Sequence, residues 1–248
     1  SMKASYLSES YTYFEENGTF NTIVAITKDK DNINKIEEVY GSDLTVLKYL
    51  LNDKELIFQY KKMYFSIKTR INNLMWDDET QFYYDLDKDE NRLSTKTIAA
   101  YWTLLAEIPN ADKADFLVDH LNNPESFGTE QPFPTLSVDN PNFSEDGNGY
   151  CGSVYPAFNF MVIKGLEKYG QYELARECSI RHLYFVLESL MPNNDKEPGD
   201  LFEAYLPNKE GCAKISADGT MARKRFLHTT ALSTIALMIE NVIGLSIS

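Results

Sequence analysis

The sequence predicts a mainly α-helical protein whose helices pair as stacked hairpins. Apolar residues recur at three- and four-residue spacings through most of the chain, which is the pattern of amphipathic helices. Stretches with the strict alternation of strands are few and short. Turn-rich connections separate neighbouring helical segments, as in antiparallel helical hairpins. We therefore expect roughly seven helices and little strand.

The first 35 residues carry the weakest pattern. Residues 11–20 are polar and aromatic, and residues 22–27 predict a short strand before a charged, turn-rich stretch. We therefore predict an irregular N-terminal segment over residues 1–35 and one helical domain over residues 36–248. Its first helix is expected at residues 36–51, interrupted by Gly41.

The next helix has the clearest pattern. Asp53 is a suitable N-cap, and apolar residues from Leu56 to Leu74 form one stripe. Further helices are predicted at residues 94–108 with Ser94 as cap, 111–121, 153–169, 171–191 and 227–242. Residues 122–149 form a loop long enough to be functional, and residues 201–205 form a short extended segment.

Charge and cysteine content exclude several classes of partner. The formal net charge is −13 without a basic stripe to offset it, so nucleic acid and anionic membrane surfaces are not expected to bind. No apolar run approaches the ~20 residues that a membrane helix needs. Three widely spaced cysteines favour a reducing, cytoplasmic location over a disulfide framework.

No metal site or cofactor is predicted. His120, His182 and His228 have no neighbours at metal-binding spacings. Residues 85–91 alternate acidic side chains like a calcium loop, but Glu90 stands where the loop requires glycine. No glycine-rich loop suited to phosphate is present either.

Four ordered motifs carry the candidate chemistry. They read LMWDDETQFYYD at residues 74–85, LNNPESF at 121–127 with PFPTLS at 132–137, GYCGSVYPAFNFMV at 149–162, and LFEAYLP at 201–207. In order and spacing they resemble the second half of the trehalase, processing-glucosidase and mannosylglycerate-hydrolase-like group of inverting glycoside hydrolases. The resemblance runs from about residue 53 to 244. It implies a partial (α/α) helical-hairpin toroid, with about three or four of the six hairpins.

The resemblance assigns a general base to Glu203. In the family the fourth motif reads Trp-Glu-Asn-Tyr-x-Pro, and its Glu activates the attacking water. An inverting glycosidase pairs such a base with an acid that protonates the leaving oxygen, the two carboxyl groups being roughly 6.5–9.5 Å apart. The competing interpretation is that Glu203 is an exposed residue without a catalytic role.

The same motifs imply a sugar-binding surface. The implied substrate-binding residues are Tyr150, Gly152, Tyr155, Asn159, Phe202, Tyr205 and His228. Tyr150, Tyr155 and Phe202 stand where the family has tryptophan, and Ala204 replaces an asparagine. The family's Gly-Trp-Thr near the last helix aligns with residues 228–230, where Thr229 cannot stack on a ring. We therefore expect a sugar subsite of altered shape.

The family's general acid, an Asp in Asp-x-Ser-x-Arg, has no counterpart in this chain. Asp139, Asp146 and Asp200 lie in predicted loops and are candidate replacements. The implied function is inverting hydrolysis of an α-glucosidic bond, in a trehalose-like disaccharide or oligosaccharide, with this chain alone inactive. The alternative is a non-catalytic carbohydrate-binding or protein-interaction module on a degenerate glycosidase scaffold, and a third is a purely structural helical domain.

A partial toroid leaves apolar helix faces uncovered. Large exposed apolar patches usually bind a partner. Besides a carbohydrate ligand, we therefore expect a homodimer, a partner chain or an N-terminal segment to cover the incomplete toroid.

Overall fold

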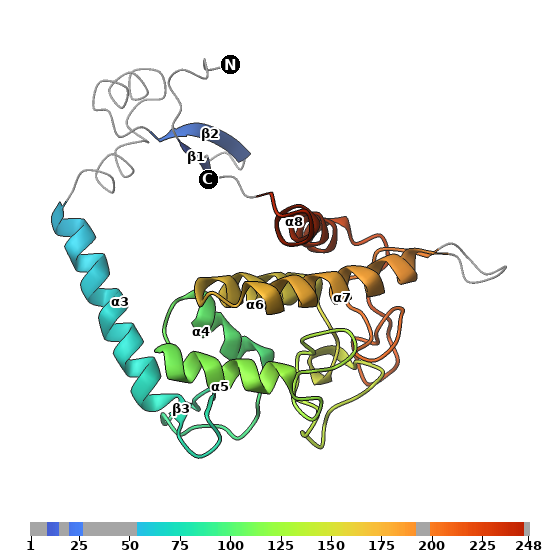
Figure 1. The fold of residues 1–248 in the computed structure, drawn as a ribbon, viewed down its shortest axis with the longest axis horizontal. Coiled ribbons are helices and arrows are strands. Elements are labelled where there is room, and N and C mark those ends of the chain that lie inside the picture. Colours follow the sequence, from blue (N-terminus) through green and yellow to red (C-terminus); the bar gives the residue numbers. More distant parts are fainter. Residues whose placement is uncertain (1–8, 15–19, 27–53, 192–198, 246–248) are drawn as a thin grey trace. The chain divides into compact units, whose positions relative to one another are not determined.

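The structure is a computed structural model that describes residues 9–14, 20–26, 54–191 and 199–245 (Figure 1). The chain divides into two compact units, Ser1–Ile67 and Lys68–Ser248. All four motifs lie in the second unit. The predicted helix at 36–51, the Asp53 cap and the domain boundary at residue 35 fall outside the described residues.

The described part of the first unit holds a β-hairpin and the start of a long helix. β1 (Glu9–Phe14) pairs antiparallel with β2 (Phe20–Ile26), close to the strand predicted at 22–27. α3 (Lys54–Leu74) begins in this unit and ends in the second, over the residues that the apolar stripe predicts.

The second unit is mainly helical. Its elements in chain order are β3 (Trp76–Asp77), β4 (Phe82–Tyr83), η3 (Ile98–Tyr101), α4 (Trp102–Leu105), α5 (Ala111–Asn122), η4 (Gly149–Cys151), α6 (Pro156–Lys168), α7 (Tyr172–Leu190), η5 (Leu227–Ala231), α8 (Leu232–Leu237) and η6 (Met238–Ile243). The helices predicted at 111–121, 153–169, 171–191 and 227–242 are confirmed within a few residues at each end. The short extended segment at 201–205 also forms, as isolated pairs with neighbouring segments.

The helix predicted from Ser94 to residue 108 is wrong in its first half. Residues 94–97 form no helix and Thr97 is extended, because Thr97 pairs with Leu136 and the Ile98 N–H donates to the Thr135 carbonyl. Helical structure starts only at Ile98 and ends at Leu105. Long-range pairing has therefore replaced the local cap that the sequence suggested.

α6 lies at the centre of the helical packing. It forms an antiparallel hairpin with α7 and also packs against α4 and α8 (Figure 1). Pro156 occupies the first turn of α6, where its missing N–H costs no hydrogen bond. Gly165 allows the close approach of α4, because a Cβ there would lie 2.9 Å from the Leu104 Cβ.

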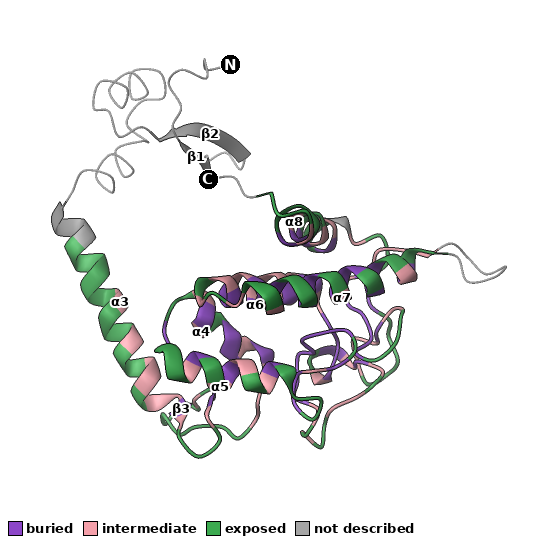
Figure 2. Cartoon of the chain, in the orientation of Figure 1, coloured by how far each residue is buried: buried purple, intermediate pink, exposed green. Residues whose placement is uncertain are grey.

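The core is aromatic, and its buried residues include most of η3, Leu104 of α4 and one side of α6 (Figure 2). Phe82 stacks on Phe127 with ring centroids 5.8 Å apart, and Tyr101 meets Phe127 edge-on at 5.5 Å. These rings come from β4, η3 and the loop after α5. They therefore join three segments that are distant in sequence.

Much of the predicted loop at 122–149 is buried. Residues 131–137 are buried one after another, although they belong to no helix or strand. Their backbone groups are paired with three other segments. Gln131 N–H donates to the Pro207 carbonyl at 2.8 Å, Thr135 N–H to Ser153 at 3.0 Å, and Ser137 N–H to Lys96 at 3.2 Å. The loop is therefore an interior connector of the second unit.

Within the described ranges, no helix combines the length and apolar character needed to cross a membrane. Cys151, Cys178 and Cys212 are all free thiols.

A buried polar cluster ties this connector to α6 and α7. His182 is fully buried, and its Nδ1 accepts from the side-chain amides of Asn159 at 3.1 Å and Gln131 at 3.3 Å. The ring hydrogen is therefore assigned to Nε2. Asn159 also donates to the Pro132 carbonyl at 2.9 Å. Burial lowers the pKa of His182 to about 4, so the ring is neutral at neutral pH.

This cluster predicts a loss of stability in mild acid. The unfolded chain protonates His182 near pH 6.5, whereas the folded protein does not until about pH 4. As pH falls through this window the unfolded state binds the extra proton, so the free energy of unfolding falls by an amount on the order of 3 kcal/mol. Denaturant titrations at several pH values would measure this fall.

His182→Gln removes the titrating group, so its unfolding free energy should depend less on pH between 6.5 and 4. His228→Gln is the matched control, because His228 is exposed and its replacement should leave the wild-type slope. An equal slope in wild type and His182→Gln would contradict this assignment.

Candidate active site

Two backbone hydrogen bonds join the third and fourth motifs. Val154 N–H donates to the Tyr205 carbonyl and Tyr205 N–H to the Val154 carbonyl, both at 2.9 Å. This antiparallel pair holds the N-terminus of α6 against the segment that contains Glu203. As a result Tyr155 packs against the cluster that contains Ala204, the residue after Glu203, although the two motifs are far apart in the sequence.

The Glu203 carboxylate forms a two-point ion pair. Arg223 Nε lies 2.8 Å from Oε2, and Nη2 lies 2.7 Å from Oε1. The backbone repeats the pairing, because Glu203 N–H donates to the Arg223 carbonyl at 2.9 Å. Only 19% of the Glu203 side chain is exposed. The hydrogen bonds from Arg223 lower the pKa of Glu203, so the carboxylate is ionised at neutral pH.

Arg223 is held from its other side by aromatic rings. Its guanidinium carbon lies 4.5 Å from the centroid of the Phe226 ring, a cation–π contact. The exposed His228 ring meets Phe226 edge-on at 5.7 Å. His228 therefore lies at the outer end of the row that starts at Glu203.

On the Tyr155 side, aromatic rings form a continuous surface. Tyr155 stacks on Tyr150 with centroids 5.6 Å apart, and Phe158 lies 5.4 Å from Tyr155. Burial, the neighbouring Tyr150 and the Glu203 charge together raise the pKa of Tyr155 to about 12. Its hydroxyl is therefore protonated at neutral pH and is able to donate a hydrogen bond.

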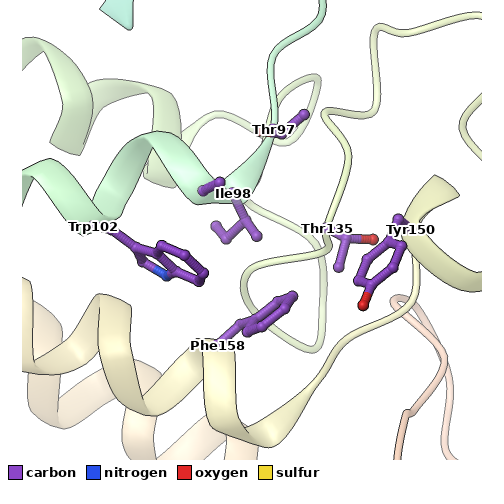
Figure 3. Close-up of a pocket in the computed structure, with 7 residues that line it drawn as sticks. Thr97, Ile98, Trp102, Thr135, Tyr150 and Phe158 are labelled. Atoms are coloured by element: carbon purple, nitrogen blue, oxygen red, sulfur yellow. The ribbon is translucent and has the colours of Figure 1, made fainter. Parts of the chain in front are cut away.

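A pocket of about 320 Å³ opens on the other side of Tyr150 (Figure 3). Trp102 lies on one side of it and Thr135 and Tyr150 lie on the other, with Phe158 between them and stacked on Tyr150 at 6.3 Å. The pocket is lined by Thr97, Ile98, Ala99, Trp102, Thr135, Tyr150 and Phe158. It therefore extends the aromatic surface from Tyr155 toward α4.

Three of the residues predicted to bind sugar are buried, so their side chains do not reach this surface. Tyr205 and Asn159 are fully buried. Phe202 is also buried, packed with Val154 and Tyr205. Tyr205 accepts the Phe202 N–H on its hydroxyl at 3.1 Å, and Asn159 bonds Pro132 and His182. These side chains therefore join neighbouring segments of the fold and are not exposed to a ligand.

Gly152 likewise has a structural explanation. Its φ is +139°, and a Cβ would lie 2.5 Å from the Ser144 carbonyl oxygen. The residue is buried, and its N–H donates to Thr135 Oγ1 at 3.2 Å. Glycine is therefore required by the turn before α6 and not by contact with a ligand.

Three residues of this surface were not among those predicted from the sequence. Phe158 follows Tyr155 by three positions on α6, so helical periodicity could have placed it beside Tyr155. Trp102 offered only the signal of a tryptophan near the start of a helix. Arg223 offered none, because its approach to Glu203 depends on pairing between segments twenty residues apart.

The three candidate acids are all engaged elsewhere. Asp139 accepts from Lys96 Nζ at 2.6 Å, and Asp146 from Lys214 Nζ at 2.6 Å. Burial favours a higher pKa for Asp139, but hydrogen bonds from Lys96 and Ser137 and the Lys96 charge outweigh it, so its pKa is lowered. The hydrogen bond and charge of Lys214 lower the pKa of Asp146.

Asp200 binds backbone groups, because its Oδ1 accepts hydrogen bonds from the N–H groups of Leu201 at 2.8 Å and Arg225 at 2.9 Å. Throughout the described part of the chain, no three His, Cys, Asp or Glu side chains are grouped to hold a metal ion.

The comparisons with known proteins point to one family. Residues 34–218 match the family model described as mannosylglycerate hydrolase MGH1-like glycoside hydrolase domain. An uncharacterized protein of Borreliella burgdorferi is 52% identical over 200 residues, which is 80% of this chain and 42% of that protein. The cytosolic neutral trehalase of Kluyveromyces lactis is 30% identical over 138 residues, which is 51% of this chain and 17% of that protein.

Among solved structures, the GH63 mannosylglycerate hydrolase from Thermus thermophilus in complex with glucose superposes with a TM-score of 0.57 at 21% identity. The superposition covers 79% of this chain and 43% of that one. This likeness confirms the predicted fold class, mainly α with helical hairpins arranged as part of a toroid. The chain spans less than half the length of each of these three relatives.

The match over residues 34–218 covers most of the chain. It includes all four motifs, and with them Glu203, Tyr150 and Tyr155. The chain therefore belongs to the mannosylglycerate hydrolase MGH1-like glycoside hydrolase domain family.

Proposed function

We propose that this chain supplies the general-base side of an inverting glycosidase site, with Glu203 as the base. The observation that carries the proposal is that the segment with the ionised Glu203 pairs through Tyr205 with Val154, directly before Tyr155, whose ring stacks on Tyr150. A carboxylate at the edge of an aromatic surface suits a reaction at a carbon of a sugar ring stacked there.

The proposed step needs two proton transfers. Glu203 accepts a proton from water while the water oxygen bonds to the anomeric carbon, and the bond to the leaving oxygen breaks. The leaving alkoxide must gain a proton as it departs. General acid catalysis of this kind contributes ~10²–10⁴-fold, and the described part of the chain offers Asp139, Asp146 and Asp200 only in ionised or backbone-bound settings.

The proposed substrate is an α-glucoside, a trehalose-like disaccharide or oligosaccharide. A trehalase among the relatives and a glucose complex among the similar structures support a glucose ring at this surface. Tyr150 and Tyr155 in place of tryptophan retain stacking over a smaller ring area.

The proposal predicts an activity that depends on the leaving group. The purified chain should not turn over trehalose at a useful rate, because the leaving alkoxide lacks an acid. It should slowly hydrolyse α-glucosyl fluoride, whose fluoride leaves without a proton, and release β-glucose. Fluoride release and polarimetry would measure the rate and the anomer.

Glu203→Gln keeps the size of the side chain and removes the base, so it should abolish fluoride hydrolysis. Glu145→Gln is the matched control, because Glu145 lies away from the Arg223 pair and bonds Asn208. Robust turnover of trehalose would show that an acid has been missed. Equal fluoride hydrolysis by Glu203→Gln would exclude Glu203 as base.

The Arg223 pair predicts a further change, in the pKa of Glu203. Arg223→Gln removes both hydrogen bonds and the positive charge that lower this pKa, so the pKa should rise toward that of an ordinary glutamate. Carboxyl ¹³C NMR titration would measure it, with the signal assigned by Glu203→Gln. Arg223→Lys keeps the charge and loses the two-point geometry, so it should give an intermediate value. An unchanged pKa in Arg223→Gln would contradict the pairing.

The same ion pair favours a second candidate, a non-catalytic carbohydrate-binding module. Both Glu203 oxygens accept from Arg223, which weakens the carboxylate as a base. In this case the chain binds glucosides on the aromatic surface without turnover. Sugar binding with no Glu203-dependent fluoride hydrolysis would favour this candidate over the first.

We also propose that a second copy of the chain covers exposed apolar helix faces. α7 and its C-cap expose one stripe and the C-terminal helical segment another, at Ile180, Tyr184, Leu187 and Met191, and at Leu232, Ile235, Ile239 and Ile243. Their three- and four-residue spacings place each set along one face of its helix. Apolar faces of this kind usually mark an interface.

Self-association should therefore be visible in solution. Multi-angle light scattering is expected to give a dimer mass that Leu187→Glu or Ile239→Glu reduces to the monomer, since each places a charge in the interface. Lys88→Glu changes an exposed residue of the turn between β4 and η3, outside both stripes, and should leave the dimer intact. A monomer mass for the wild-type chain would rule out the second copy as the covering partner.

A further inference from the structure

We propose that Thr230 is a positioning residue for Glu203, because its buried hydroxyl holds the peptide group that leads into the candidate base. Thr230 is fully buried, so it acts through Glu203 and not by contact with a ligand. The inference rests on the proposed function and deepens it, since it names a residue of the C-terminal helical segment on which the orientation of the base depends.

The first argument is that the peptide group between Phe202 and Glu203 is held on both edges. The Thr230 hydroxyl donates to the Phe202 carbonyl at 2.7 Å, and the Glu203 N–H donates to the Arg223 carbonyl at 2.9 Å. A peptide group is planar, and its plane includes the Cα atoms on both sides. Two hydrogen bonds on opposite edges therefore fix the plane, and with it the Cα atom from which the Glu203 side chain extends.

The second argument is the partner that the Thr230 hydroxyl has. Serine and threonine hydroxyls within helices commonly donate to a carbonyl three or four residues earlier in the same helix. Ser179 and Ser189 of α7 do this, at 2.7 and 2.8 Å. Thr230 donates instead to a carbonyl 28 positions earlier in the chain, from the π-helical turn η5, a kind of turn that is frequent at functional sites. Its hydroxyl therefore joins two segments of the site.

The third argument is the geometry of the ion pair. A carboxylate and a guanidinium form two parallel hydrogen bonds only in a matched orientation. The Glu203–Arg223 pair makes both bonds, at 2.8 and 2.7 Å, and its backbone hydrogen bond involves the same peptide group that Thr230 holds. A rotation of that peptide group would turn the carboxylate away from Arg223. Thr230 therefore stabilises the ion pair through the backbone.

The fourth argument is burial. Phe202 and Thr230 are both buried, so the Phe202 carbonyl depends on this donor. An unpaired buried carbonyl costs free energy, which a rotation of the peptide group toward another donor or toward water would recover. Loss of the Thr230 hydroxyl should therefore move the peptide group that leads into Glu203.

Thr230→Val tests this directly, because it replaces the hydroxyl by a methyl group of similar size. Carboxyl ¹³C NMR titration should show the pKa of Glu203 rising toward that of an ordinary glutamate, as the hydrogen bonds from Arg223 weaken. With α-glucosyl fluoride, kcat should fall about tenfold, because a displaced base is less effective. KM should not change, because Tyr150 and Tyr155 belong to other segments.

Three further variants isolate the hydroxyl. Thr230→Ser keeps it and should retain the wild-type pKa and kcat. Thr230→Ala removes it without adding a methyl group in its place, so it should repeat the effect of Thr230→Val even where valine packs poorly. Thr234→Val is the matched control four residues later, because the buried Thr234 hydroxyl forms no hydrogen bond with any described residue. It should leave both values unchanged, and thermal melts would establish that each variant is folded.

A wild-type Glu203 pKa in folded Thr230→Val and Thr230→Ala would overturn the inference. An equal rise in Thr230→Ser or Thr234→Val would also overturn it, since the Thr230 hydroxyl would not be the cause. So would a change in KM alone, which would place the effect at the sugar-binding surface. Fluoride hydrolysis by the wild-type chain tests the proposed base separately. If that hydrolysis is absent while the pKa rises only in the variants without the Thr230 hydroxyl, Thr230 positions the carboxylate and only the base assignment fails.

Discussion

The second unit depends on one buried connector that has no regular structure of its own. Residues 131–137 run through the interior, so every backbone N–H and C=O there must find a partner or cost the free energy of an unmade hydrogen bond. Their partners lie at Lys96 and Ile98 before α4, at Ser153 before α6, and at Pro207 beyond Glu203. Satisfying this one segment therefore fixes the positions of three of the segments that build the site.

The same constraint explains which elements the sequence could predict. α5, α6 and α7 follow their apolar periodicity, because a helix satisfies its own backbone and needs only one buried face. The predicted helix at 94–108 failed where residues 96–98 serve as partners for the connector. No local pattern shows that residues 96–98 must pair with the connector, because the connector lies some forty positions away in the chain.

The sequence likewise predicted some features of the candidate site and not others. The resemblance of the motifs predicted that Glu203, Tyr150 and Tyr155 lie together; the structure stacks Tyr155 on Tyr150 and pairs Val154 with Tyr205, the neighbours of Tyr155 and Glu203 in the two motifs. Asn159 and Tyr205 are fully buried, which the motifs could not predict, because a motif records which residue types recur and not which of them are buried. Arg223 was not predicted from the sequence, for another reason. It lies in a segment without a motif and reaches Glu203 only through pairing in three dimensions.

Arg223 also sets the chemical character of the site. A net charge of −13 would favour protonation of a half-buried carboxylate, and the two hydrogen bonds from Arg223 oppose this and keep Glu203 ionised. The same two bonds direct one lone pair of each oxygen toward Arg223 and lower the basicity of both. Arg223 therefore fixes the position of the Glu203 carboxylate and at the same time lowers its basicity. The lowered basicity of Glu203 does not impair a site that only binds glycosides. A site that cleaves them needs an oxygen of Glu203 to accept a hydrogen bond from water while Arg223 remains in place. The remaining exposure of the Glu203 side chain allows water to reach it, and the protonated Tyr155 hydroxyl is able to donate a hydrogen bond.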